Sequence, residues 1–81
     1  MIFKKKRKRV TLFLYNDNFN SFETVCLSLR NYLPNCNIIR AEQLAMLAHN
    51  NGKVQITSGF APEIYQIQAN LIRSGLTIET K

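Results

Sequence analysis

The stretch VTLFLYNDNFNSFE, residues 10–23, contains the signals that decide how the fold begins. Its first six residues are β-branched, aromatic or leucine, and this composition predicts a β-strand over residues 10–15. Asn20 can cap a helix, and Glu23, three positions later, would complete a capping box. The stretch therefore predicts a strand that leads through a short polar turn into a helix.

The next two helices are predicted from apolar side chains at helical spacing. In the first helix, which Pro34 closes, these side chains are Phe22, Val25, Cys26, Leu29, Tyr32 and Leu33. A second helix is expected between a cap at Asn37 and a C-terminal glycine at Gly52. Its buried stripe is expected to be Ala41, Leu44, Ala45 and Ala48.

A third helix is predicted near the end of the chain. Pro62 favours its start, Glu63 suits its first turn, and the helical pattern runs through Arg73. Ser74-Gly75 then ends it. Its buried side is expected to be Ile64, Ile67 and Leu71.

Two short strands complete the predicted elements. One covers residues 53–57 and is followed by a turn at Ser58-Gly59, and the other covers residues 76–79. The resulting order, β-α-α-β-α-β, predicts an α+β fold. We expect a small three-stranded antiparallel sheet with three helices packed on one of its faces.

The net charge of +6 comes from the first nine residues. Six of the eleven Lys and Arg residues form the run KKKRKR, residues 4–9, and the other five balance the five acidic residues of 10–81. We expect residues 1–9 to be a flexible basic tail and residues 10–81 to be one domain. Such a run attracts phosphates, so one alternative function is a nucleic-acid or ribosome-associated binding protein. The other interpretation is a solvated arm that aids solubility.

No segment indicates a membrane protein. The longest uncharged apolar run, residues 10–15, is far shorter than the roughly 20 residues that span a bilayer, and it is short for a signal peptide. We therefore expect a monomeric cytoplasmic protein without a membrane partner.

Several kinds of chemical site are excluded by spacing. Cys26 and Cys36 show no paired Cys/His spacing, so no metal site is expected. Asp17 and His49 could form an acid–base pair, but no nucleophile accompanies them and no phosphate-binding loop is present. We predict no catalytic residues, no cofactor and no enzymatic activity.

Asn16, Asp17 and His49 are the candidate binding residues. The first two leave the first strand and His49 ends the second helix, so the predicted topology can place them across a shallow cleft. All three accept hydrogen bonds when the imidazole is neutral, and an ammonium group offers three donors. The apolar walls of this cleft are expected to be Phe22, Val25, Ala45 and Ala48. This set predicts a site for the N-terminal residue of a peptide.

Each of these residues also has a simpler interpretation. Asn16, Asp17 and Asn18 are typical turn residues. His49 suits the C-terminal end of a helix dipole. Phe22 and other apolar side chains of the first helix can be ordinary core residues.

Two segments resemble the ClpS adaptors of the bacterial and plastid N-end rule. YNDNFNSFE, residues 15–23, is similar to a family pattern of a strand, Asn-Asp-Asp, an aromatic residue, Thr-Pro and a hydrophobic residue before Glu. AEQLAMLAHNNGK, residues 41–53, is similar to a pattern with Ala, Gln-Leu-Met, His and Gly-Lys. The resemblance covers residues 10–81 and is to a divergent member.

The resemblance implies an adaptor that binds N-degrons, which are proteins beginning with Phe, Leu, Tyr or Trp. It would deliver them to a ClpA- or ClpC-type AAA+ unfoldase for degradation by ClpP. By resemblance, Asn16, Asp17 and His49 would hold the α-amino group, and Leu76 would close the floor of the side-chain pocket. Glu63 would contact the N-terminal domain of the unfoldase.

Three departures from the family pattern are informative. Asn18 replaces a second acid, which weakens the negative field at the site. Ala45 stands where the family has methionine, so the pocket is expected to be roomier and to tolerate Ile or Val as the first residue, unless Phe22 fills the space. The tail is shorter and more basic than the extension that the unfoldase usually engages.

Overall fold

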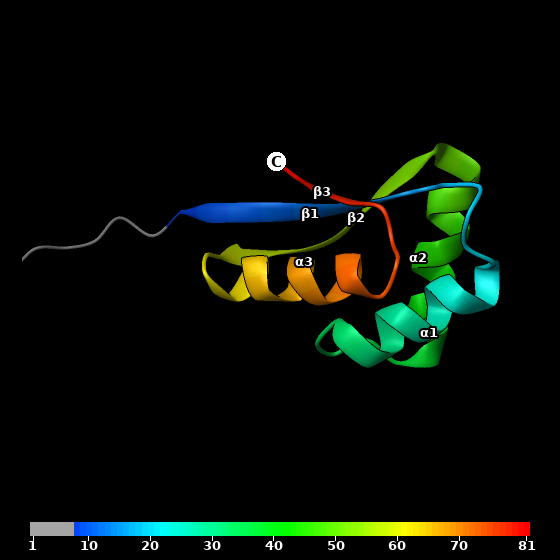
Figure 1. Cartoon of the computed structure of the whole chain (residues 1–81), viewed down its shortest axis with the longest axis horizontal. Helices are drawn as coiled ribbons and strands as arrows, with labels where there is room; N and C mark the ends of the chain where they lie inside the picture. Colours follow the sequence, from blue (N-terminus) through cyan, green and yellow to red (C-terminus); the bar gives the residue numbers. More distant parts are fainter. Residues whose placement is uncertain (1–7) are drawn as a thin grey trace, which may run out of the picture.

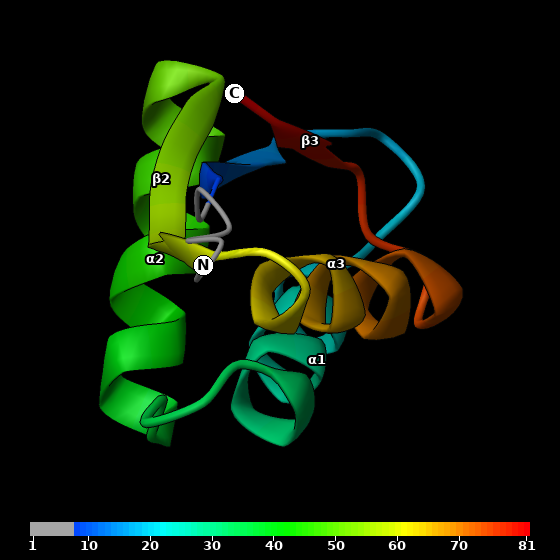
Figure 2. The same cartoon turned by 90° about the vertical axis from the view of Figure 1, so that its left-hand side faces the viewer.

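The computed structural model describes residues 8–81, and the first seven residues, with most of the predicted basic tail, lie outside the described part. An antiparallel sheet in the order β2-β1-β3 is formed by β1 (Arg9–Tyr15), β2 (Lys53–Phe60) and β3 (Ile78–Thr80). The helices are α1 (Phe22–Tyr32), α2 (Ile38–Asn51) and α3 (Glu63–Arg73). Figure 1 shows α3 and α1 beneath the sheet, and Figure 2 shows α2 beside β2. The predicted fold class and element order are confirmed.

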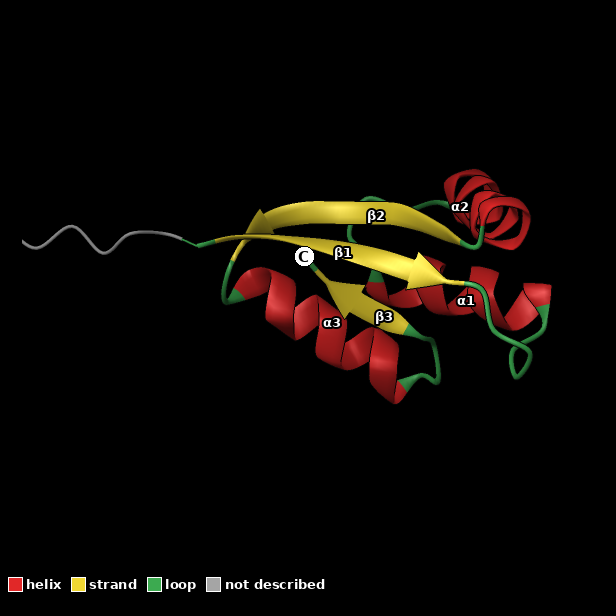
Figure 3. Ribbon diagram, turned by 90° about the horizontal axis from the view of Figure 1, so that it is seen from above, coloured by secondary structure: helices red, strands yellow, loops and turns green. Residues whose placement is uncertain are grey.

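The central strand β1 organises the core. Val10, Leu12 and Leu14 alternate along it and are almost fully buried, as expected for a strand with one covered face. Viewed from above, the opposite face of the sheet is not covered by any helix of residues 8–81 (Figure 3). The buried stripe of α2 is confirmed and is formed by Ala41, Leu44, Ala45 and Ala48. Small side chains on this stripe let α2 approach its neighbours closely.

The start of α1 differs from the predicted capping box. Ser21 is the N-cap, and its hydroxyl accepts from the backbone N–H of Thr24 at 3.1 Å. The Asn20 side chain instead donates to Gly75 O, at 2.8 Å, and to the carboxylate of Asp17. The prediction that Asn20 caps the helix was therefore wrong, because this amide is used to join two loops.

The strand β2 is longer than predicted. It continues to Phe60 and pairs with the first residues of β1, so the turn expected at Ser58-Gly59 was wrong. A Cβ at Gly59 would lie 3.1 Å from Ile64 Cδ1, which is closer than ordinary van der Waals contact. Gly59 therefore marks a close approach of α3 to the sheet and not a turn.

Other boundaries follow the prediction with small shifts. Asn37 caps α2, accepting from Arg40 N at 2.8 Å, and Gly52 ends it with a φ of 87°. The last strand begins at Ile78 and not at Leu76, because Leu76 N donates to Leu71 O at the end of α3. No helix in residues 8–81 is long and apolar enough to cross a membrane.

The apolar stripe of α1 is only partly buried. Cys26, Leu29 and Leu33 are in the core, but Phe22 is 38% exposed and Tyr32 is 44% exposed. For Phe22 this exposure excludes the simpler interpretation as an ordinary core residue. Both residues lie at an end of α1, which packs against α2 and α3. Phe22 is thereby free to line a surface pocket.

Candidate functional site

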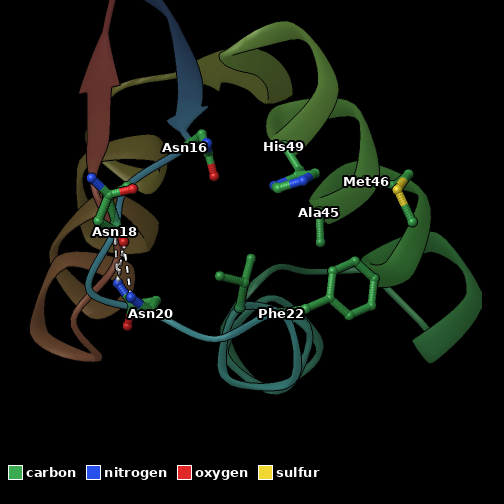
Figure 4. Close-up of a pocket in the computed structure, with 9 residues that line it drawn as sticks. Asn16, Asn18, Asn20, Phe22, Ala45, Met46 and His49 are labelled. Atoms are coloured by element: carbon green, nitrogen blue, oxygen red, sulfur yellow. Dashed lines mark hydrogen bonds between the residues drawn. The ribbon is translucent and has the colours of Figure 1, made fainter.

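Backbone hydrogen bonds join the end of β1 to the end of α2 and the start of β2. Asn16 N donates to Gly52 O at 2.9 Å, and Tyr15 pairs with Lys53 in the sheet. His49 lies three residues before Gly52, so these contacts bring the strand end and the last turn of α2 together. Figure 4 shows the side chains of Asn16 and His49 pointing toward the same hollow. Sequence reasoning predicted this pairing from topology.

A pocket of about 490 Å³ opens between this junction and α1. Its volume falls in the roughly 300–1,000 Å³ range of small-ligand sites. Its lining residues are Asn16, Asp17, Asn18, Asn20, Phe22, Val25, Ala45, Met46 and His49. The structure thus brings all three predicted amine-binding residues together with three of the predicted apolar ones.

Two predicted pocket residues lie elsewhere. Ala48 lines a smaller adjoining hollow of about 30 Å³ with Val25 and Ala45. Leu76 is buried in the core and is not among the residues that line either hollow. Asn18, Asn20 and Met46 are lining residues that the sequence reasoning did not propose. Met46 follows Ala45 directly on α2, and no sequence signal distinguishes it from the other exposed residues of that helix.

A large side chain on α1 faces a small one on α2. The Phe22 ring reaches toward α2 and lies beside Ala45 and Met46 (Figure 4). Ala45 is nearly buried, whereas Phe22 keeps more than a third of its surface exposed. A longer side chain at position 45 would therefore extend into the pocket that Phe22 also lines.

The carboxylate of Asp17 fastens the loop that follows β1. Its Oδ1 accepts from the backbone N–H groups of Phe19 and Asn20, both at 2.9 Å. Its Oδ2 accepts from Thr77 Oγ1 at 2.9 Å, and the Asn20 amide donates to both oxygens. The turn interpretation of this segment is therefore correct, and the same turn forms one side of the pocket. Because a carboxylate offers about four acceptor positions, these bonds use nearly all of them.

These bonds keep Asp17 ionised. Burial alone would raise the pKa of this carboxyl. The hydrogen bonds that it accepts outweigh burial and lower its pKa below the ordinary value. They come from the backbone N–H groups of Asn20 and Phe19, the Thr77 hydroxyl and the Asn20 amide. A full negative charge therefore stands at the side of the pocket at neutral pH. It favours a cationic ligand.

Glu63 lies at the other end of the molecule. It is an exposed residue in the first turn of α3, which begins shortly after the far end of β2. The pocket lies where Tyr15 pairs with Lys53, and the opposite end of the same ladder pairs Arg9 with Phe60. The structure therefore does not bring Glu63 to the pocket. Glu63 belongs to a separate surface.

The two cysteines are free and buried in the core. Burial raises the pKa of the Cys36 thiol, and burial with the nearby carboxylates of Glu42 and Glu23 raises the pKa of the Cys26 thiol. Both are therefore neutral thiols at physiological pH. Within residues 8–81, no group of three or more His, Cys, Asp or Glu side chains is placed to hold a metal ion.

Comparisons with known proteins identify the family of this chain. The family model for ATP-dependent Clp protease adaptor protein ClpS matches residues 5–77. The ATP-dependent Clp protease adapter protein ClpS of Thermosynechococcus vestitus is 29% identical over 75 residues, which make up 93% of this chain and 80% of that protein. The chain therefore belongs to the ClpS family of Clp protease adaptors.

Proposed function

We propose that this adaptor binds the free N-terminal amine and bulky apolar first residue of N-degron substrates. The observation that carries the proposal is the convergence of Asn16, Asp17 and His49 at the mouth of a partly apolar pocket. An ammonium group would meet oxygen and nitrogen acceptors there, and the attached side chain would enter between α1 and α2. No catalytic role is proposed for any of these residues.

The three polar residues have different roles in this proposal. Within residues 8–81, the side chains of Asn16 and His49 make no hydrogen bond, so their acceptor atoms are available to the ammonium group. Asp17 already accepts bonds at both oxygens. It therefore acts mainly through its charge and by fixing the loop that carries Asn16.

The side-chain pocket in this proposal is formed by Phe22, Val25 and Ala45, with Met46 at its rim. Ala48 supports it from the adjoining hollow. Burying an apolar side chain here adds the hydrophobic part of the affinity. A small or polar first residue would gain little from the same pocket.

Delivery requires a second contact. We propose that Glu63 contacts the N-terminal domain of a ClpA- or ClpC-type AAA+ unfoldase, which passes the substrate to ClpP. Because Glu63 and the pocket lie at different ends of the β1–β2 ladder, one monomer can hold substrate and unfoldase together.

A degradation assay tests the proposed function. A reporter that begins with Leu is expected to be degraded by the cognate unfoldase and ClpP only when this protein is added, and a reporter that begins with Ala is not. Glu63→Gln should slow degradation and leave peptide affinity unchanged. The matched control is Glu79→Gln, which removes an exposed carboxylate on β3. Adaptor-independent degradation of both reporters would contradict the proposal.

The placement of Phe22 and Ala45 in one pocket predicts how selectivity changes. In Ala45→Met, the new side chain competes with the Phe22 ring, and overpacking of this kind costs about 1–3 kcal/mol. We expect peptides beginning with Phe, Leu and Ile to bind about 5- to 150-fold more weakly, and to similar degrees, when affinities are measured by fluorescence anisotropy.

A second substitution makes this prediction specific. Phe22→Ala added to Ala45→Met should restore binding of Phe and Leu peptides, because the ring no longer occupies the space. The control is Leu47→Met, which places methionine at an exposed position of α2 outside the pocket. If Ala45→Met weakens only Ile and Val peptides, the space beside Ala45 is open and the Phe22 ring does not fill it.

A second candidate function remains for the basic segment. On the sheet face that no helix covers, the Arg9 guanidinium lies 5.5 Å from the Phe60 ring centroid, and Lys53 Nζ lies 5.6 Å from that of Phe13. Cations beside aromatic rings favour single-stranded nucleic acid. Deleting residues 1–7 should abolish binding of an oligonucleotide and leave peptide binding intact. Loss of peptide binding in this deletion would instead assign the tail to the peptide site.

A further inference from the structure

The hollow surface continues beyond the pocket, past Phe22. A second hollow of about 380 Å³ lies between α1 and the first part of α2. We call it the α1–α2 groove, and its lining residues are Phe22, Glu23, Cys26, Leu27, Ile38 and Glu42. Because Phe22 lines both hollows, its ring forms the boundary between them. A chain that leaves the pocket over this ring enters the groove directly.

The groove exposes large apolar side chains. Leu27 is 52% exposed and Ile38 is 41% exposed, and they come from two different helices. Apolar side chains from two elements that gather in one hollow mark a surface suited to binding. A single exposed leucine would not carry this inference.

Two carboxylates stand over the groove. Glu23 and Glu42 are exposed, and no ion pair is recorded for either within residues 8–81. Their charges act on the groove floor, since both help to raise the pKa of the Cys26 thiol. The groove therefore combines an apolar floor with a negative rim. Its electrostatic complement is a segment that carries both apolar and cationic side chains.

We propose that the α1–α2 groove binds the residues that follow the first residue of an N-degron, and that it favours apolar residues interspersed with Lys or Arg. This inference rests on the proposed function, because the peptide is placed by its first residue in the pocket. We assign this occupant for two reasons. Phe22 lines both the pocket and the groove, and the carboxylates of Glu23 and Glu42 have no ion-pair partner within residues 8–81. Acidic residues soon after the N-terminus are disfavoured.

Peptide affinities test the proposal. Three peptides of equal length begin with a free leucine and continue with alternating Lys and Leu, with Ala and Ser, or with alternating Glu and Leu. We expect the Lys-containing peptide to bind roughly 3- to 10-fold more tightly than the Glu-containing one at low salt, and less so at high salt. In a Glu23→Gln, Glu42→Gln double variant this difference should disappear. Glu79→Gln, which alters a carboxylate outside the groove, should keep it.

A separate variant tests the contribution of the apolar side chains of the groove. Leu27→Ser should weaken the Lys- and Leu-containing peptide about threefold by removing apolar contact, while leucine amide, which fills only the pocket, competes equally well. The control is Ile72→Ser on α3, where the isoleucine is 49% exposed and lies outside the groove. Both serines replace exposed residues, and circular dichroism would verify that each variant folds.

The results that contradict the groove proposal differ from those that contradict the proposed function. If leucine amide and all three peptides fail to bind, the proposed function and the groove proposal are both overturned. If leucine amide binds but the three peptides have equal affinities, only the groove proposal is overturned. The groove proposal is also overturned if the charge preference persists in the double variant. If Leu27→Ser weakens binding of the unfoldase N-terminal domain and not of peptides, the groove belongs to the unfoldase.

Discussion

Peptides that begin with leucine are expected to bind His49→Ala at least about 10-fold more weakly than the unaltered protein. The substitution removes an acceptor for the ammonium group, and hydrogen bonds to charged groups contribute about 1.5–3 kcal/mol. Fluorescence anisotropy with a labelled peptide measures the change. The matched control is Asn50→Ala, the next exposed residue of α2, which does not line the pocket.

A conservative variant tests whether His49 acts as an acceptor. His49→Gln keeps a side-chain oxygen that accepts hydrogen bonds, so it should bind the leucine peptide more tightly than His49→Ala does. An affinity of His49→Ala equal to that of the unaltered protein would remove His49 from the site.

Asp17→Ala is expected to lower both stability and peptide affinity. It leaves the backbone N–H groups of Phe19 and Asn20 and the Thr77 hydroxyl without their acceptor. We expect the free energy of unfolding to fall by about 1–3 kcal/mol, as measured by urea denaturation at neutral pH. The control for stability is Asn18→Ala, because the side-chain amide of Asn18 makes no hydrogen bond within residues 8–81.

The sign of the pH effect makes this prediction sharper. Because folding lowers the pKa of Asp17, its contribution to stability is present above the ordinary aspartate value of 3.8 and is lost as the pH falls through the folded value. The difference in stability between the unaltered protein and Asp17→Ala should therefore shrink in acid. A constant difference from neutral pH down to about pH 2 would show that the carboxylate charge contributes nothing.

The parts of the fold that the sequence predicted are those set by local pattern. Alternation along β1 and the helical stripe that contains Leu44 and Ala48 each identify a buried face from spacing alone. The caps at Asn37 and Gly52 are equally local, since each acts within a few residues of its own position. These elements were sufficient to predict the order of the fold.

The errors arose where a distant partner decides the role of a residue. Asn20 has the composition of a cap, but its amide bonds Gly75, which is 55 residues away. Gly59 has the composition of a turn, but its lack of a side chain accommodates Ile64 of α3. Neither partner can be identified from the local stretch. In both cases tertiary packing overrode a correct statistical preference.

Part of the candidate site was predictable from the order of the strands and helices. Asn16, Asp17 and His49 lie at the ends of a strand and a helix, and this order alone places those ends together. Met46 was missed because pocket lining depends on side-chain direction and exposure, which spacing did not resolve at the edge of the α2 stripe. The saturation of Asp17 by its own loop could not be predicted either, because it involves Thr77.

Acetylation of the peptide tests the central claim most directly. A labelled peptide beginning with leucine and its N-acetylated twin differ in one positive charge and in the donors that Asn16 and His49 would accept from. The proposed function predicts that the free peptide binds at least about 10-fold more tightly in an anisotropy titration at neutral pH. Equal affinities for the two peptides would contradict it.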